Sequence, residues 1–201
     1  GYTGAVLTDI LAGHPEVRLQ ALTTQSYVGQ SVTEVFPGLR VEAVYEAYNV
    51  DAVAGSDVAF VCYPHAQAHP VVAELVDAGV RVVDLSADYR LKDTAAYPAW
   101  YGFQHTRPDL VAEAVFGSPE LYRDQIKKAR LVANPGCYPT SVILAAVPAA
   151  SDIDPTLGVI ADSKSGVSGA GRTPSPKTHF CKVHGDFRAY SEVGHRHTPE
   201  M

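Results

Sequence analysis

The stretch DVAFVCYPHAQAHPVVAELVDAGVRVVDL, residues 57–85, establishes the fold class of this chain. It opens with a β-branched and aromatic run, residues 57–63, that stops at Pro64 and predicts a strand. Apolar residues then recur at helical spacing over residues 69–78 and end at a glycine, which predicts a helix. Residues 80–85 predict a second strand. Strand, helix and strand in this rhythm imply a right-handed crossover and a parallel sheet.

The same alternation continues in both directions from this core. Residues 87–116 interrupt it, because they are rich in Tyr and Pro and show no clear period; we expect an ordered connection packed over the sheet edge. A change of domain is expected near Pro135 and Gly136, which divides the chain into residues 1–135 and 136–201. The other expected elements are helices at residues 4–12, 121–129 and 137–147 and strands at residues 17–23, 131–133 and 157–163.

The composition excludes several classes of protein. A hydrophobic content of 46% with 19% charged residues is typical of a soluble globular chain. The net charge of -6 argues against a nucleic-acid partner, and the longest apolar run, residues 141–150, is too short for a membrane partner. Three cysteines make no disulfide framework, so we expect a cytoplasmic protein. Because the chain begins at Gly1 without a Met and stops directly after a dense polar motif, we expect truncation at both ends.

The glycine-rich start is a candidate cofactor site. Gly1, Tyr2, Thr3 and Gly4 open the first predicted helix, where glycines allow a backbone to approach a dinucleotide pyrophosphate. A glycine turn that binds no ligand is the alternative, with about even odds from this motif alone.

The end of the next predicted strand bears on which dinucleotide would bind. An NAD enzyme usually places a carboxylate there to bind the ribose. Here the strand ends in Thr23-Thr24-Gln25-Ser26, without a carboxylate to repel a 2′-phosphate and with hydroxyls to bond it. The sequence therefore favours NADP(H).

The segment Asn134-Pro135-Gly136-Cys137-Tyr138-Pro139-Thr140 is the most informative candidate for catalysis. The Pro-Gly turn places Cys137 at a helix N-terminus, where the partial positive charge favours the thiolate, the nucleophilic form. A small buried cysteine is the alternative for any single cysteine, and we keep that interpretation for Cys62 and Cys181.

A thiolate needs a partner that handles protons, and residues 194–200 (GHRHTPE) supply candidates. In an extended segment His195 and His197 point the same way, with Arg196 opposite, and Glu200 follows. Two histidines on one face also suit zinc, but no third ligand stands at a characteristic spacing, so no metal is expected.

A second glycine-rich loop spans residues 165–172 (SGVSGAGR). Gly166, Ser168 and Gly169 offer backbone N–H groups to a phosphate or to the carboxamide of a cofactor, and Arg172 could pair with an anion. A flexible surface loop is the alternative.

With these motifs in order, the sequence resembles the N-acetyl-gamma-glutamyl-phosphate reductase family, NADPH enzymes of arginine biosynthesis. The resemblance covers nearly the whole chain. Where family members often carry a Ser-Arg-like pair after the second strand, this chain has Thr24-Gln25. The matching motifs are GYTG (1–4), DLSADYRL (84–91), WYGF (100–103), ANPGCYPT (133–140), residues 165–172 and HRHTPE (195–200).

The resemblance implies an α/β fold: a Rossmann-type parallel sheet domain followed by the start of an α+β catalytic domain. It implies Cys137 as the catalytic nucleophile and His197 as the acid/base, with His195 and Glu200 nearby. It implies NADP(H) at residues 1–4 and 166–169, and a small-molecule acyl phosphate reduced through a cysteine thioester. Asn134 would stand near the oxyanion, and Arg172 or Arg196 would hold the substrate anion. A homo-oligomer, dimer or tetramer, is implied as well.

Other functions stay open at this point. Related reductases act on carrier-linked aminoadipate phosphate or on aspartyl phosphate through the same thioester chemistry. A Cys–His hydrolase would use the same pair without a cofactor loop, and a non-catalytic nucleotide-binding module would need neither residue. Cofactor binding and acyl-phosphate reduction separate these possibilities.

Overall fold

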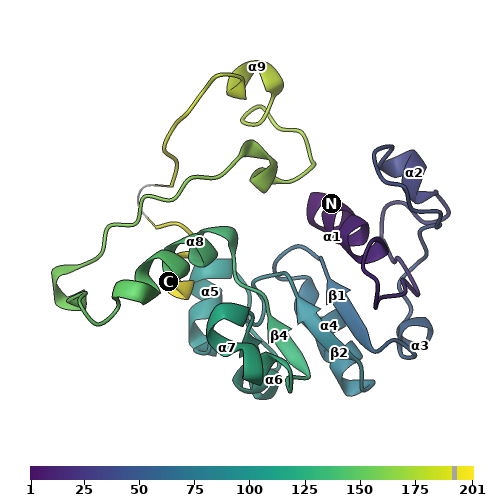
Figure 1. Ribbon diagram of the computed structural model, residues 1–201, viewed down its shortest axis with the longest axis horizontal. Helices are drawn as coiled ribbons and strands as arrows, with labels where there is room; N and C mark the ends of the chain where they lie inside the picture. Colours follow the sequence, from purple (N-terminus) through teal and green to yellow (C-terminus); the bar gives the residue numbers. More distant parts are fainter. Residues whose placement is uncertain (192–193) are drawn as a thin grey trace.

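The computed structural model describes residues 1–191 and 194–201, and within them the core is a four-stranded parallel sheet (Figure 1). Its strands lie in the order β1-β2-β4-β3, and Val82 of β2 pairs with Ala59 of β1 and Leu131 of β4. The strands are β1 (Val58–Val61), β2 (Arg81–Asp84), β3 (Val115–Phe116) and β4 (Leu131–Ala133). The predicted α/β class with a parallel sheet is confirmed.

The crossover from β1 to β2 runs through α4 (Ala68–Asp77). Val72, Leu75 and Val76 of this helix are buried against the sheet, as their spacing predicted. Each such side chain contributes about 1.5–3 kcal/mol by leaving water. The strand–helix–strand unit at residues 57–85 is therefore confirmed, and it carries the main core.

The other helices surround this unit. The predicted helices at the chain start, after residue 120 and after Gly136 are confirmed within a few residues. The helices are α1 (Tyr2–Ala12), α2 (Val32–Val35), α3 (Val50–Val53), α5 (Tyr97–Tyr101), α6 (Pro108–Glu113), α7 (Pro119–Ile126), α8 (Cys137–Ala146) and α9 (Phe180–Val183). Short 3-10 turns lie at Thr94–Ala96, Val147–Ala149, Pro155–Leu157, Val167–Ala170 and Thr198–Glu200.

The connection at residues 87–116 is more helical than its sequence indicated. It contains α5 and α6, of five and six residues, each with a proline in its first turn. Helices this short do not complete two turns, so they leave no hydrophobic period to detect. Gly102 ends α5 in the left-handed conformation, at φ 75°.

Two predicted strands are wrong. Within residues 17–23 only Thr23 pairs, through an isolated bridge to Glu46. Residues 158–163 have no regular structure, and Ile160 there is 99% exposed. Alternating apolar residues favour a strand only when a neighbour accepts its backbone hydrogen bonds. Neither segment has such a neighbour along its length in the described part of the chain.

A second, smaller core lies beside α2. Val32, Val35, Val41 and Tyr45 are buried together, with Phe36 and other partly buried apolar side chains packed around them. Ser31 and Glu34 form a capping box at the start of α2. We call this unit, residues 27–45, the α2 platform.

A long excursion, residues 157–191, leaves the end of α8 and carries α9 at its tip before the chain returns beside α8 (Figure 1). We call it the strap. Most of its residues are exposed, including Phe180 and Phe187. Among the described residues, no helix combines the length and apolar character needed to cross a bilayer.

Candidate active site

Cys137 is the first residue of α8, as the Pro-Gly turn predicted. Gly136 is its N-cap, in extended conformation, and its carbonyl accepts hydrogen bonds from the Thr140 N–H at 3.0 Å and hydroxyl at 2.9 Å. The thiol is free and exposed. A helix start presents N–H groups without intrahelical acceptors, so negative charge on this sulfur is favoured.

His197 packs directly against this helix start. Its imidazole is buried, and a Cβ built on Gly136 would stand 2.8 Å from Cε1 and 3.0 Å from Nδ1 of His197. The same Cβ would stand 3.0 Å from a guanidinium nitrogen of Arg90. The position before Cys137 therefore requires glycine, because an imidazole and a guanidinium fill the space of a side chain.

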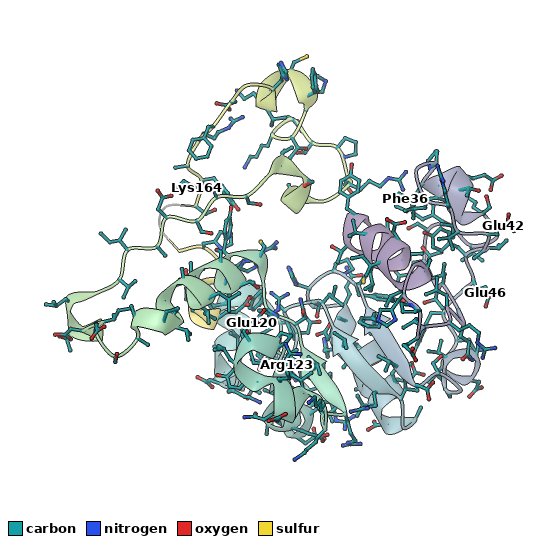
Figure 2. The ribbon with its side chains drawn as sticks, viewed as in Figure 1. Phe36, Glu42, Glu46, Glu120, Arg123 and Lys164 are labelled. Carbon is teal, nitrogen blue, oxygen red and sulfur yellow. The ribbon has the colours of Figure 1, made fainter. Side chains whose placement is uncertain are left out.

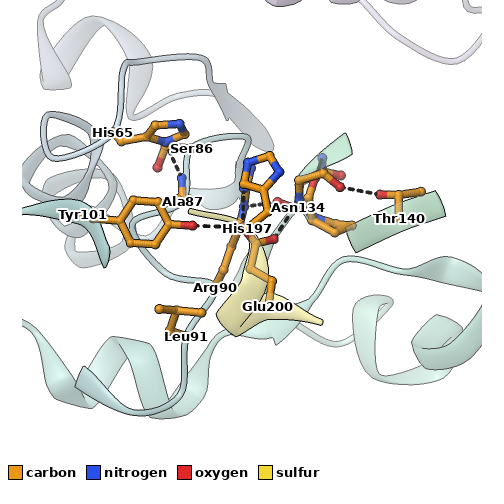
Figure 3. Close-up of polar contacts among 12 residues, drawn as sticks. His65, Ser86, Ala87, Arg90, Leu91, Tyr101, Asn134, Thr140, His197 and Glu200 are labelled. Atoms are coloured by element: carbon orange, nitrogen blue, oxygen red, sulfur yellow. Dashed lines mark hydrogen bonds and ion pairs between the residues drawn. The ribbon is translucent and has the colours of Figure 1, made fainter. Parts of the chain in front are cut away.

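Glu200 holds this arrangement together (Figure 3). Its Oε1 accepts hydrogen bonds from Arg90 at 2.9 Å and from the Tyr101 hydroxyl at 3.0 Å, and its Oε2 accepts from the Gly136 N–H at 3.0 Å. The carboxylate side chain is fully buried. Glu200 thus connects the C-terminal segment, α5 and the turn that carries Cys137.

Arg90 completes the network. Its Nε donates to the carbonyl of Asn134 at 2.7 Å, and one terminal nitrogen donates to the carbonyl of Leu85 at 2.9 Å. The other terminal nitrogen binds Glu200, and both side chains of this ion pair are at most 4% exposed. Buried charges of this kind are stable only when paired and hydrogen-bonded throughout, and these are.

His195 lies beside His197, with ring centroids 4.8 Å apart. Its Nδ1 accepts the backbone N–H of His197 at 3.1 Å, in a turn rather than the extended segment expected from sequence. The rings of Tyr138 and Tyr190 contact it edge-on at 5.1 and 5.7 Å, and the Tyr190 hydroxyl donates to that of Tyr138. His195 is thus held among aromatic rings.

Burial sets the charge state of these groups. It lowers the pKa of His197 to about 4, with nearby Arg90 acting in the same direction and Glu200 opposing. Burial also lowers the pKa of His195, followed by the charge of Arg196, and raises that of Tyr101. At neutral pH His197 is therefore an uncharged imidazole, the form that can accept a proton.

Sequence reasoning assigned no role to three residues of this site: Arg90, Tyr101 and His65. The first two lie in motifs that carried the resemblance, DLSADYRL and WYGF. His65 follows β1; its Nδ1 accepts the N–H of Ala87 at 3.0 Å, and its ring lies 5.7 Å from that of Tyr101 (Figure 3). Only His65 had a local signal, since it lies two residues after the strand predicted at residues 57–63.

The candidate cofactor residues at the chain start occupy the expected place. Gly1 is the N-cap of α1, and a Cβ there would meet nothing within 4 Å. A Cβ on Gly4 would lie 3.9 Å from that of Cys62, the residue after β1. The N-terminus of α1 therefore lies at the carboxyl end of a parallel strand, where open α/β sheets bind dinucleotides. A helix N-terminus at this edge of the sheet fits a pyrophosphate.

Thr23 and Thr24 lie at the pairing with Glu46. The N–H of Thr24 donates to the carbonyl of Glu46 at 2.9 Å, and its hydroxyl accepts the N–H of Ser26 at 3.2 Å. Gly166, Ser168 and Gly169 are exposed, in and before the 3-10 turn of the strap. A Cβ on Gly169 would stand 2.8 Å from the hydroxyl of Ser165, so the loop is tightly folded.

The three candidate substrate residues are not brought together. Asn134 is within the Arg90 network, and Arg196 is exposed next to the histidines. Arg172 lies on the α2 platform, where its guanidinium stands 4.5 Å from the ring centroid of Phe36. Among the described residues no cluster of three or more potential metal ligands occurs.

Comparisons with known proteins agree with this geometry. Residues 1–129 match the family described as semialdehyde dehydrogenase, NAD binding domain, and residues 137–201 match semialdehyde dehydrogenase, dimerisation domain. The chain is 48% identical to N-acetyl-gamma-glutamyl-phosphate reductase of Symbiobacterium thermophilum, covering 100% of the chain and 59% of that protein. The corresponding reductase of Syntrophobacter fumaroxidans is 49% identical with the same coverage, and that of Dehalococcoides mccartyi strain CBDB1 is 50% identical over 58% of its length. The chain thus spans less than two thirds of the relatives it matches.

Proposed function

The chain belongs to the semialdehyde dehydrogenase family, and from that membership we propose that it is the reductase of N-acetyl-glutamyl 5-phosphate. The reaction is an NADPH-dependent reductive dephosphorylation that gives N-acetyl-glutamate 5-semialdehyde, a step of arginine biosynthesis. The observation that carries the proposal is an identity of 46–50% over the whole chain to enzymes of that name. The geometry around Cys137 supports it.

Cys137 is the nucleophile of this proposal. Its thiolate attacks the carbonyl carbon of the acyl phosphate, phosphate leaves, and a thioester to Cys137 remains. The N–H of Gly136 is already bound to Glu200, so the free N–H groups of Cys137 and Tyr138 at the start of α8 are the donors for the oxyanion. Asn134, three residues before Cys137, stabilises the loop because its backbone carbonyl accepts the hydrogen bond from Arg90.

His197 handles the proton. As a neutral imidazole packed against Gly136, it takes the thiol proton before attack. After the thioester is reduced, the carbon–sulfur bond breaks as the aldehyde forms, and the imidazolium returns its proton to the released Cys137 thiolate. His195 orients this ring through the bond between its Nδ1 and the His197 backbone. Glu200 and Arg90 position the neighbouring residues of the site, because both oxygens of the Glu200 carboxylate are already hydrogen-bonded.

NADPH, when bound, supplies the hydride that reduces the thioester to the aldehyde level. The open N-terminus of α1 at residues 1–4 would hold its pyrophosphate. Thr23 and Thr24 would face the ribose, and Gly166, Ser168 and Gly169 would contact the dinucleotide from the strap. The preference for NADPH rests on the absence of a carboxylate in residues 23–26.

The deciding experiment follows the reverse reaction of the full-length enzyme. We expect NADP⁺ to be reduced when N-acetyl-glutamate semialdehyde and inorganic phosphate are both present, and not when phosphate is omitted. Aspartate semialdehyde and carrier-linked aminoadipate semialdehyde serve as competing substrates. A higher kcat/KM with either competitor would transfer the proposal to that substrate, and aldehyde-independent ester hydrolysis would indicate a Cys–His hydrolase instead.

Cofactor choice and assembly are tested separately. We expect kcat/KM with NADPH to exceed that with NADH at least tenfold, and equal values would contradict the assignment from residues 23–26.

We also propose a homo-oligomer, a dimer or tetramer, on the strength of the match to a dimerisation domain. Light scattering of the full-length enzyme measures its mass in solution, and a monomer would refute this part.

A further inference from the structure

Arg172 makes an unusual set of contacts for a residue that ends a glycine-rich loop. Its guanidinium stands 4.5 Å from the ring centroid of Phe36 and 5.4 Å from that of Tyr27. One terminal nitrogen donates to the Tyr27 hydroxyl at 3.3 Å and the other to the carbonyl of Val35 at 3.2 Å. These partners lie 137 to 145 residues away in sequence.

The surface that receives Arg172 is preorganised. Val35 is buried in the core of the α2 platform, and the N–H of Phe36 donates to the carbonyl of Val32 at 2.8 Å. Tyr27 packs on Tyr45 of the same core, with centroids 6.3 Å apart. Phe36 lies beside α2 on the side nearest the strap (Figure 2). The groups that contact Arg172 are therefore fixed by the platform's own core and backbone hydrogen bonds.

The contacts leave Arg172 poorly placed to bind a substrate anion. Its guanidinium carbon lies over the rings of Phe36 and Tyr27 in a cation–π arrangement, and both terminal nitrogens already donate to oxygens of the platform. Instead, these contacts attach the end of the loop at residues 166–171 to the half of the chain that contains α1 and α2.

We propose that Arg172 is a positioning residue that latches the glycine-rich loop of the strap to the α2 platform, and so preorganises the loop for dinucleotide binding. The inference rests on the proposed function, because it takes residues 166–169 as cofactor contacts. A loop tethered before the ligand arrives loses less conformational freedom on binding, and affinity rises accordingly. The latch acts on the whole dinucleotide and contacts neither its 2′-phosphate nor the acyl phosphate.

Three variants of the full-length enzyme test the latch: Phe36→Leu, Arg172→Gln and Arg172→Lys. Phe36→Leu removes a stacking platform without changing charge. Arg172→Lys keeps the charge and removes the planar face. The matched control is Phe187→Leu, the same change at an exposed phenylalanine of the strap. The readouts are the Kd values for NADPH and NADH by fluorescence titration, and amide hydrogen exchange of residues 166–172 in the cofactor-free enzyme.

We expect each of the three variants to raise both Kd values by the same factor, roughly two- to fivefold, as for loss of a cation–π contact at an exposed site. Hydrogen exchange of the loop should be faster, and the double variant Phe36→Leu/Arg172→Gln should be no worse than Arg172→Gln alone. The control should match the native enzyme in every measurement, and all variants should keep its circular dichroism spectrum.

Other results would overturn the latch. If the variants lost affinity for NADPH but not for NADH, Arg172 would be a ligand of the 2′-phosphate. If only the KM for acyl phosphate rose, Arg172 would be a substrate ligand. Native-like Kd values and exchange in Phe36→Leu would remove the latch altogether. If the native enzyme bound neither dinucleotide, the proposed function would fail, and hydrogen exchange in the cofactor-free protein would still decide whether the latch exists.

Discussion

The imidazole of His197 lies so close to the backbone of Gly136 that no side chain fits at position 136. A methyl group on Gly136 would stand 2.8 Å from the imidazole and 3.0 Å from the guanidinium of Arg90. Both neighbours are buried, and Arg90 is fixed by three acceptors. At the residue scale, the geometry of the proposed nucleophile, Cys137, and its proposed base, His197, is therefore set by the absence of a side chain.

We expect Gly136→Ala to lower kcat at least tenfold while leaving the Kd for NADPH unchanged, because the overpacked methyl displaces His197 at a cost of about 1–3 kcal/mol. Gly38→Ala is the matched control, since a Cβ there meets nothing within 4 Å. Steady-state kinetics and fluorescence titration measure the two effects. Normal turnover in Gly136→Ala would show that His197 is not required in its present position.

The roles of the thiol and the imidazoles can be separated kinetically. Cys137→Ser should abolish thioester formation, because a hydroxyl is a far weaker nucleophile than a thiolate. His197→Asn should still bind NADPH and should lower kcat by about 10²–10⁴, and His195→Asn should cost less. Near-normal turnover in His197→Asn with loss in His195→Asn would reverse their assignments.

Chemical labelling checks the same assignment in the native enzyme. Iodoacetamide should modify Cys137 first and abolish activity. Cys62 and Cys181 are exposed, not buried as expected from sequence. Cys62 should still react slowly, because desolvation by its neighbours raises the pKa of its thiol to about 11 and the thiolate is scarce at neutral pH. Peptide mapping identifies the labelled cysteine. Loss of activity with the label on Cys62 or Cys181 would exclude Cys137 as the nucleophile.

The buried His197 should also make stability depend on pH. Its pKa is about 4 in the folded protein and 6.5 without burial. Between these values the unfolded chain binds a proton that the folded protein does not, so stabilisation present above pH 6.5 is lost as the pH falls toward 4. We expect the free energy of unfolding of the native protein, relative to His197→Asn, to fall by about 2 kcal/mol between pH 7.5 and pH 5.

The comparison with His197→Asn is necessary because Asp84 acts in the opposite direction. Burial raises the pKa of its carboxyl to about 7, so its stabilisation is complete below pH 3.8 and is lost as the pH rises through 7. Asp84 is present in both proteins, and its contribution cancels in the difference. Denaturant titrations at several pH values give the measurement; a constant difference would contradict a buried neutral His197.

At the scale of elements, the turn from β1 into α4 is stabilised by a carboxylate in the loop that follows β2. Asp88 is fully buried and accepts the N–H groups of Ala66, Ala68 and His69 at 2.8 to 3.0 Å. Gln67, the N-cap of α4, supplies no side-chain cap. Asp88 therefore caps this helix from a distance of about twenty residues in sequence, and it holds Ala66 in its left-handed conformation, φ 65°.

We expect Asp88→Ala to lower the free energy of unfolding by about 3 kcal/mol or more, because three N–H groups lose their acceptor in a buried place. Asp93→Ala is the control: Asp93 caps a 3-10 turn through one exposed hydrogen bond to Ala95, and its loss should cost about 1 kcal/mol. Denaturant unfolding compares the two. Equal losses of unfolding free energy in the two variants would show that Asp88 stabilises the protein no more than the exposed cap at Asp93 does.

At the scale of the whole molecule, Glu200 connects segments that the chain keeps far apart. Its partners Arg90, Tyr101 and Gly136 are separated from it by 110, 99 and 64 residues. The ion pair with Arg90 is almost entirely excluded from water. Removing one partner of such a pair leaves an uncompensated buried charge, which is far costlier than breaking an exposed pair.

We expect Glu200→Gln to cost about 3–5 kcal/mol of stability and to lower kcat, since the turn that carries Cys137 loses its anchor. Glu113→Gln breaks the exposed pair with Arg130 and should cost less than about 1 kcal/mol. Thermal unfolding and steady-state kinetics of the full-length variants provide both measurements. If Glu200→Gln lost activity at unchanged stability, Glu200 would take part in proton transfer rather than in positioning.

Local patterns in the sequence determined the strand–helix–strand unit at residues 57–85 and the placement of Cys137 at the start of α8. In both cases the information is confined to neighbouring residues: apolar spacing along one helix face, and a Pro-Gly turn that ends one element and begins the next. The chemistry of a thiolate pointed to the histidines at residues 195–197 as its partners, and the resemblance to a family added which of them would act as the acid/base.

Tertiary structure alone decided the rest. Residues 17–23 and 157–163 were expected to be strands but form none, because a strand is stable only beside a partner and the local sequence does not say whether one exists. Likewise no local signal joins Arg90 to Glu200, or Arg172 to Phe36, since the partners of each pair lie more than a hundred residues apart and meet only in the tertiary structure. Spacing along a chain reports contacts within a turn of helix or a pair of strands. Contacts between residues more than a hundred positions apart depend on tertiary packing. Packing determines which partners lie close enough to pair with a buried charge or to stack on an aromatic ring.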